Sequence, residues 1–213
     1  MPLSNISPTS LTAQDGLLRL KEGNQRFLHG EARFSVTHNK ETLADLAKGQ
    51  HPFATILGCS DSRVPPELIF DAGFGDLFIV RVAGNVISAE VMGSMQFAGL
   101  HLKTPLFVVL GHEGCGAVQA AVAYKLRGQR PNARIQDLVD GILPSVPDYD
   151  GQISPEEYLA AAVESNVRWT MQQIMQTSDD QDRLVEGPLH VIGAVYEIAT
   201  GKVRFLDDDI ITT

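Results

Sequence analysis

The sequence has no long apolar run, no excess of positive charge and only two cysteines. Its longest apolar stretches are only strand-sized, and residues 1–10 are polar and contain proline, so we expect neither a membrane span nor a cleavable signal. A formal net charge of −9 without a concentrated basic patch argues against a nucleic-acid partner. These absences favour a cytoplasmic protein with a small-molecule substrate, although a processed organellar or exported form stays open.

The 213 residues, of which 44% are hydrophobic, suffice for one sizeable core, and no linker or repeat divides them. We therefore predict a single domain over residues 1–213, with an N-terminal helical arm at 1–50 and an α/β core at 51–213. Strand-like and helix-like segments alternate, as in a central, mostly parallel β-sheet flanked by helices. The expected helices are 11–28, 41–48, 88–102, 115–127 and a long one from Pro155 to about Ile174, and the expected strands are 53–58, 77–82, 106–110, 189–196 and 202–206.

Three residues that zinc prefers as ligands follow two of the predicted strands. Cys59 comes directly after strand 53–58, and His112 and Cys115 come after strand 106–110. Because parallel strands bring their carboxyl ends to the same edge of a sheet, we expect the three side chains to meet there. Three protein ligands leave the fourth position of a tetrahedral zinc ion open, which is typical of catalytic rather than structural sites.

Other interpretations of these residues stay open at this point. The cysteines are also compatible with small buried side chains or a disulfide, with His112 as an ordinary core residue. Gly111, Gly114 and Gly116 after a strand resemble a phosphate-binding loop, but their order is wrong for a dinucleotide fingerprint and no P-loop lysine follows. A structural zinc site is a third alternative, with Asp61 as the only obvious fourth ligand.

The two loops together resemble a known family. The run Cys59-Ser60-Asp61-Ser62-Arg63-Val64 with Gly111-His112-Glu113-Gly114-Cys115-Gly116 is similar to the paired signature of the β-class carbonic anhydrases, closer to the plant-like members. Residues 20–27, 75–85 and 193–206 also resemble that family. The resemblance implies an enzyme that reversibly hydrates carbon dioxide to bicarbonate and a proton through a hydroxide bound to one Zn²⁺ per subunit.

The resemblance also implies a role for each matching residue. The metal ligands would be Cys59, His112 and Cys115, and Asp61 with Arg63 would form a dyad beside the metal. Substrate contacts would come from the Gln50 side chain, the Gly116 N–H and an apolar wall of Phe78, Val82 and Phe97. A homodimer or tetramer would complete the site, with Gln50 and the Phe78 region reaching the zinc of a neighbouring subunit or lying at the shared interface.

Two positions depart from the family pattern. Phe97 stands where many members have tyrosine, so an apolar wall remains without the hydroxyl. Ile56 stands where members regulated by bicarbonate have tryptophan, so we do not expect that regulation here. The sequence leaves open a preference for carbonyl sulfide or carbon disulfide, because the same zinc chemistry attacks either carbon.

The ligand set predicts a pH dependence. Two thiolates and a neutral imidazole leave zinc with a formal charge near zero, so it is a weaker Lewis acid than zinc held by three imidazoles. Water on three-imidazole zinc has a pKa of about 7. We therefore expect hydration activity to climb on the alkaline side of neutrality, as measured by stopped-flow rates from mildly acid to alkaline pH. A flat profile would contradict this ligand set.

Overall fold

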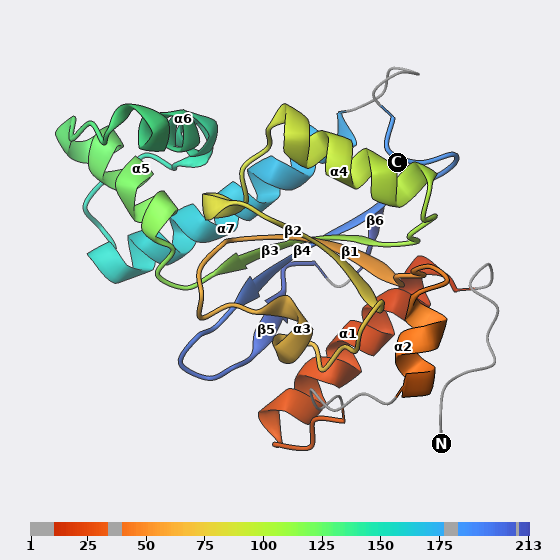
Figure 1. The fold of residues 1–213 in the computed structure, drawn as a ribbon. Helices are drawn as coiled ribbons and strands as arrows, with labels where there is room; N and C mark the ends of the chain where they lie inside the picture. Colours follow the sequence, from red (N-terminus) through yellow and green to blue (C-terminus); the bar gives the residue numbers. More distant parts are fainter. Residues whose placement is uncertain (1–10, 34–39, 177–182, 208) are drawn as a thin grey trace.

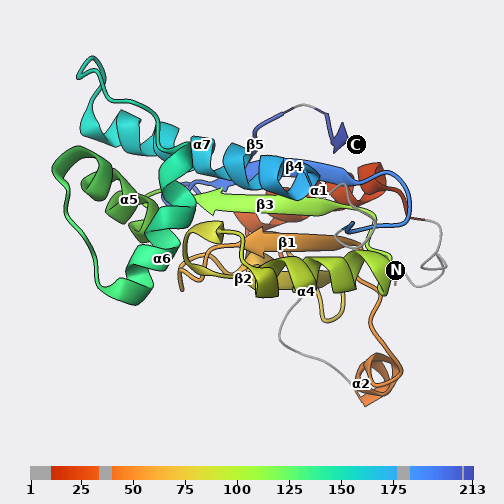
Figure 2. The same ribbon diagram turned by 90° about the horizontal axis from the view of Figure 1, so that it is seen from above.

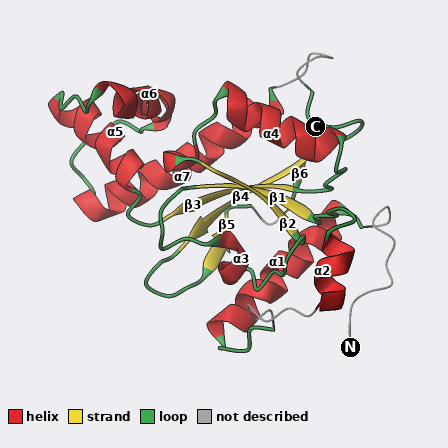
Figure 3. Cartoon of the chain, viewed as in Figure 1, coloured by secondary structure: helices red, strands yellow, loops and turns green. Residues whose placement is uncertain are grey.

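The computed structural model describes residues 11–33, 40–176, 183–207 and 209–213. Within them, a six-stranded sheet forms the central layer, with helices on both faces (Figures 1 and 3). The strand order is β2-β1-β3-β4-β5, and β6 pairs with β4. The strands are β1 (Ala54–Gly58), β2 (Leu77–Arg81), β3 (Phe107–His112), β4 (His190–Tyr196), β5 (Val203–Phe205) and β6 (Ile211–Thr212).

The first four strands are parallel to one another, whereas β5 and β6 run antiparallel to β4. This arrangement confirms the expected mostly parallel α/β sheet. In the register between β1 and β3, Gly58 pairs with Leu110. The residues that follow these two partners in sequence therefore emerge at the same edge of the sheet.

The helices divide between the two faces (Figures 1 and 2). One face is covered by α4 and α7, with α5 and α6 at the end of the sheet, and the other by α1 and α3. A helix that lies at the margin, α2, buries none of its residues. The helices are α1 (Ala13–Leu28), α2 (Lys40–Leu46), α3 (Pro66–Ile69), α4 (Ala89–Leu100), α5 (Gly116–Arg127), α6 (Ala133–Ile142) and α7 (Pro155–Met175), with single 3-10 turns η2 (Ala83–Asn85) and η3 (Leu143–Ser145).

Alternating side chains of the strands feed two separate apolar layers, because successive strand residues point to opposite faces. Ile56 belongs to the layer with Leu17 and Leu20 of α1. Its neighbour Leu57 belongs to the layer with Val167 of α7. All five of these side chains are fully or almost fully buried.

The long helix α7 begins at the predicted capping box. The Ser154 hydroxyl accepts from the Glu157 N–H at 3.2 Å, and the Glu157 carboxylate accepts from the Ser154 N–H at 2.9 Å. Glycines then allow α7 to lie directly on the sheet, since a Cβ on Gly111 would stand 2.6 Å from Val167 Cγ2. A Cβ on Gly193 would stand 2.6 Å from Met171 Sδ. A side chain at either glycine would push the helix away from β3 and β4.

The predicted N-terminal arm is only partly described, because residues 1–10 and 34–39 lie outside the described residues. Helix α1 packs against its own chain, where Gly16 lies so close to the sheet that an added Cβ would be 3.0 Å from the Phe53 carbonyl oxygen. Leu17 and Leu20 of α1 are thus buried within one subunit, whereas Leu18 is 54% exposed.

The expected helices and strands are confirmed to within two residues at each end. Five of the described elements were not predicted: α3, α6, β6 and the 3-10 turns η2 and η3. Among the described residues, no helix combines the length and the hydrophobicity that a bilayer crossing requires.

Candidate metal centre

The structure brings Cys59, His112 and Cys115 together at the carboxyl edge of the sheet. Cys59 directly follows β1, His112 is the last residue of β3, and Cys115 directly precedes α5. Their ligand atoms all lie within 4.8 Å of one another, and all three residues are buried. The two sulfurs are 4.0 Å apart, about twice the length of a disulfide bond of roughly 2.05 Å, and both thiols are free.

The geometry of this Cys–His–Cys cluster fits a tetrahedral metal ion. Zinc–sulfur bonds of about 2.3 Å place two thiolates about 3.8 Å apart in a tetrahedral site, close to the separation seen here. The His112 Nδ1 lies 2.9 Å from the carbonyl oxygen of Glu113, which fixes the tautomer with the proton on Nδ1. The buried Nε2 then has a free lone pair and no hydrogen-bond partner. A metal ion would satisfy that atom.

The pKa values of the two thiols are shifted in opposite directions. A hydrogen bond from Cys115 lowers the pKa of Cys59, burial opposes that shift, and His112 and the N–H groups of Gly84 and Asp61 add to it. The pKa of Cys115 is raised by its hydrogen bond to Cys59 and by burial. A metal ion binds cysteine as the thiolate, so any proton held between the two sulfurs has to leave when a cation binds. Metal affinity should therefore fall as the pH is lowered.

Asp61 lies beside the cluster and is held by Arg63. The guanidinium donates from Nε to Asp61 Oδ1 at 3.0 Å and from Nη2 to Oδ2 at 2.7 Å, and the Arg63 N–H also donates to Oδ1 at 2.9 Å. This two-pronged contact holds the pKa of the Asp61 carboxyl well below its usual range. Asp61 Oδ2 is 3.8 Å from His112 Nε2. An ionised acceptor thus stands next to the position that a metal would occupy.

A second arginine fixes the backbone of the same loop. Arg81, the last residue of β2, donates from Nε to the Cys59 carbonyl oxygen at 2.9 Å. Its Nη2 donates to the Asp61 carbonyl oxygen at 2.6 Å. The backbones of Cys59 and Asp61 are therefore both tied to β2 by one side chain.

Of the five predicted substrate residues, two lie near the cluster in the described chain. The Val82 N–H donates to the carbonyl oxygen of Gly58, the residue before Cys59, at 3.1 Å. Gly116 follows Cys115 and is the first residue of α5, where the backbone N–H has no partner within the helix.

The other three predicted substrate residues lie away from the cluster. Gln50 precedes β1, whereas Cys59 follows it, so the two stand at opposite ends of that strand. Phe78 pairs with Thr55 near the beginning of β1, and its ring centroid is 6.3 Å from that of Phe97, which is 47% exposed. One subunit does not bring these three residues to its own metal centre.

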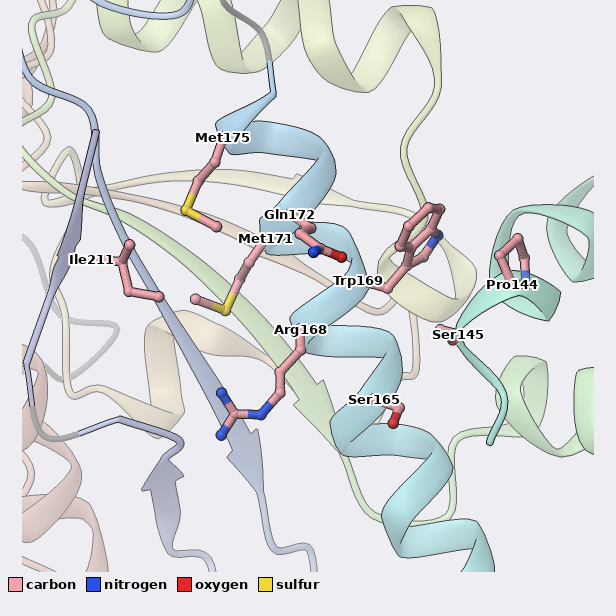
Figure 4. A pocket seen from close by; sticks show the side chains of 9 residues that line it. All are labelled: Pro144, Ser145, Ser165, Arg168, Trp169, Met171, Gln172, Met175 and Ile211. Carbon is pink, nitrogen blue, oxygen red and sulfur yellow. The ribbon is translucent and has the colours of Figure 1, made fainter. Parts of the chain in front are cut away.

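A groove of about 360 Å³ runs along α7 (Figure 4). The Arg168 guanidinium in this groove is paired with Glu164 at 3.3 Å and Asp207 at 3.1 Å. None of the predicted site residues lines it. Its lining residues are Pro144, Ser145, Ser165, Arg168, Trp169, Met171, Gln172, Met175 and Ile211.

Two residues that contact the Cys59 loop were not predicted from the sequence. Arg81 binds its backbone, and the Gly84 N–H donates to Cys59 Sγ at 3.4 Å. Both lie in the segment 75–85 that resembles the family, so a signal was present. That resemblance gave roles only to Phe78 and Val82.

Comparison with known proteins agrees with this geometry. A family model described as carbonic anhydrase matches residues 54–203. Carbonic anhydrase 2 of Mycobacterium tuberculosis is 41% identical over 193 residues, which cover 88% of this chain and 90% of that protein. The solved structure of the β-carbonic anhydrase CcaA has a TM-score of 0.72 and 28% identity, and the match covers 92% of each chain.

A further solved structure supports the fold alone. It comes from a study of two tetrameric β-carbonic anhydrases of the filamentous ascomycete Sordaria macrospora, with a TM-score of 0.70 and 23% identity over 82% of this chain and 89% of that one. The sheet, the Cys–His–Cys cluster and the matched residues 54–203 all agree with one family. This chain therefore belongs to the carbonic anhydrase family and, within it, to the β class.

Proposed function

We propose that this protein is a zinc enzyme that reversibly hydrates carbon dioxide to bicarbonate and a proton. The observation that carries the proposal is the buried Cys–His–Cys cluster, whose His112 Nε2 is left without a partner, next to an aspartate held in place by an arginine. Membership of the carbonic anhydrase family supports the same reaction.

Cys59, His112 and Cys115 would hold the zinc ion. When bound there, zinc acts as a Lewis acid and lowers the pKa of a water molecule toward the neutral range. Asp61, ionised and held by Arg63, accepts a hydrogen bond from the reacting water and orients it toward the substrate carbon. The Gly116 N–H at the beginning of α5 faces the oxygen on which negative charge develops, and Val82 keeps part of the site apolar.

A second copy of the chain would complete the substrate pocket. Gln50, Phe78 and Phe97 lie away from the cluster of their own subunit, so their proposed substrate contacts require a neighbouring subunit. Carbon dioxide is small and apolar, and a dry wall with one or two donors suits it. We therefore propose at least a dimer; the tetrameric enzymes of similar fold are compatible with a larger assembly.

The described geometry favours a catalytic site over a structural zinc site. A permanent fourth protein ligand would have to be Asp61, the one candidate that the sequence offered. The group whose ligand atoms all lie within 4.8 Å of one another contains the two cysteines and His112 but not Asp61. Both carboxylate oxygens of Asp61 instead accept from Arg63.

The substrate preference can be tested by measuring carbon dioxide hydration beside hydrolysis of carbonyl sulfide and carbon disulfide. Sulfur is a weak hydrogen-bond acceptor, so each oxygen replaced by sulfur weakens the contact with donors such as the Gly116 N–H. We expect the rate to fall about tenfold per replacement, which corresponds to roughly 1.4 kcal/mol. If either sulfur compound were turned over faster than carbon dioxide, that compound would become the proposed substrate.

We also propose a cytoplasmic location. A reducing compartment keeps both cysteine thiols available for a metal, whereas an oxidising one favours disulfides.

A further inference from the structure

A tight turn next to the metal centre has an uncommon backbone conformation. In the 82–85 turn, the Asn85 N–H donates to the Val82 carbonyl oxygen at 3.0 Å. Gly84 and Asn85 both have positive φ angles, of 72° and 46°. Consecutive left-handed residues are sparsely populated, and a non-glycine residue is held there at a cost in stability. Contacts from elsewhere in the fold must therefore stabilise this turn.

Two polar side chains of α7 supply those contacts. Asn166 Nδ2 donates to the Gly84 carbonyl oxygen at 2.9 Å. The Thr170 hydroxyl donates to the Asn85 carbonyl oxygen at 3.2 Å and accepts from Asn85 Nδ2 at 3.4 Å. Asn166 and Thr170 are each only 1% exposed. Since they are four residues apart, they lie on the same face of the helix.

These two residues are exceptions on an apolar surface. The same face of α7 carries Val163, Val167 and Met171, all buried against the sheet. A buried amide or hydroxyl without a hydrogen-bond partner is destabilising, so polar residues in such a place need a partner. Their hydrogen bonds to the 82–85 turn satisfy this requirement.

The 82–85 turn also contacts a proposed metal ligand, Cys59. The Gly84 N–H donates to Cys59 Sγ at 3.4 Å, while its carbonyl oxygen is held by Asn166. The space around Gly84 is also filled, since an added Cβ would lie 2.6 Å from Ile142 Cδ1 of α6. The Gly84 carbonyl and the Gly84 N–H belong to consecutive peptide groups, so α7 holds the peptide group next to the one that donates to the cysteine sulfur.

We propose that Thr170 and Asn166 are positioning residues for the metal centre: they hold the 82–85 turn so that the Gly84 N–H donates to Cys59 Sγ. This inference rests on the proposed zinc site. A hydrogen bond to a ligand sulfur fixes its direction and offsets part of its charge, and loss of such an outer contact typically lowers metal affinity or activity by about 10–100-fold. Neither residue contacts the metal or the substrate itself.

The test uses two isosteric substitutions of buried threonines. Thr170→Val removes the hydroxyl that holds the turn, whereas Thr55→Val removes a hydroxyl from a buried pair, 2.9 Å from Thr104 Oγ1, that contacts none of the cluster residues. We expect Thr170→Val to bind Co²⁺, used as a spectroscopic probe, about tenfold more weakly than the unaltered protein and to shift the thiolate-to-cobalt absorption band. Thr55→Val should lower stability but leave the Co²⁺ affinity and the absorption band unchanged. Thr170→Ser, which retains the hydroxyl, should have the Co²⁺ affinity and absorption band of the unaltered protein.

A second substitution keeps the test decisive if Thr170→Val does not fold. Asn166→Ala removes the hydrogen bond to the Gly84 carbonyl oxygen and should weaken Co²⁺ binding in the same way. Co²⁺ affinity and spectrum in the folded variants equal to those of Thr55→Val would overturn the positioning role. If the unaltered protein bound the metal but did not hydrate carbon dioxide, only the proposed function would fail, because the affinity comparison needs no turnover.

Discussion

Replacement of Asp61 by alanine is expected to leave zinc bound and to lower kcat/KM for carbon dioxide hydration about a hundredfold. The metal should remain because Asp61 lies outside the Cys–His–Cys cluster. The activity should fall because the carboxylate that orients the reacting water is gone. Zinc content by atomic absorption and rates by stopped flow, on the same samples, measure the two effects separately.

Arg63→Ala should produce a similar loss, because it frees the Asp61 carboxylate from the two-pronged contact that turns it toward the reacting water. The double variant should then be little worse than either single one, as expected for residues that act as a unit. Since Arg63 holds the pKa of Asp61 well below its usual range, the unaltered carboxylate stays ionised at neutral and alkaline pH, and the deficit of Asp61→Ala should persist across that range.

An exposed ion pair outside both loops, with Lys103 before the start of β3 and His112 at its end, provides the control for these variants. Lys103 Nζ and Glu186 Oε2 are 2.8 Å apart on the surface. An exposed ion pair of this kind contributes little to the stability of the folded protein. Glu186→Gln should therefore leave both zinc content and hydration unchanged. Full activity in Asp61→Ala would end the proposed role of the dyad.

Replacement of Cys59 by serine is expected to remove zinc and, with it, hydration activity. A serine hydroxyl stays protonated near neutral pH and cannot replace a thiolate as a charged ligand. Structural zinc sites with four ligands bind with about 10–16 kcal/mol, so one ligand contributes roughly 3 kcal/mol, or more than a hundredfold in affinity. Metal content after dialysis against a chelator measures the loss.

The neighbouring residue supplies the control for Cys59→Ser. Ser60 is exposed in the same loop, and Ser60→Ala alters the loop without altering a proposed ligand. It should retain zinc and activity. Circular dichroism should show the same helix content in both variants. Zinc retained at full occupancy by folded Cys59→Ser would rule out this residue as a ligand.

The capping box was the local sequence signal that most clearly predicted where a helix begins. Helix α7 begins where its capping box indicated, at Ser154 and Glu157. No capping box marks the beginning of α6, although Ile135, Leu138 and Ile142 recur at helical spacing after Asn132, so this helix was missed despite a periodic signal. The four-residue α3 and the two-residue β6 are too short for a periodic pattern to reveal them.

The predicted convergence of Cys59, His112 and Cys115 is confirmed for a physical reason that does not extend to their surroundings. Ligands at the carboxyl ends of neighbouring parallel strands meet by the topology of the sheet, so the convergence of Cys59 with His112 follows from the strand assignment. The hydrogen bonds of Asn166 and Thr170 to the 82–85 turn depend on the docking of α7. The sequence carries only an indirect sign of them, namely two polar residues within an apolar helical face.

Zinc titration of metal-free protein, with carbon dioxide hydration followed in the same sample, tests most directly whether the Cys–His–Cys cluster holds a catalytic metal. We predict that activity rises in proportion to added zinc and reaches its plateau at one zinc per chain, and that Cys59→Ser gives no such rise. Undiminished hydration by the metal-free protein, or a fully zinc-loaded protein without hydration, would contradict the account.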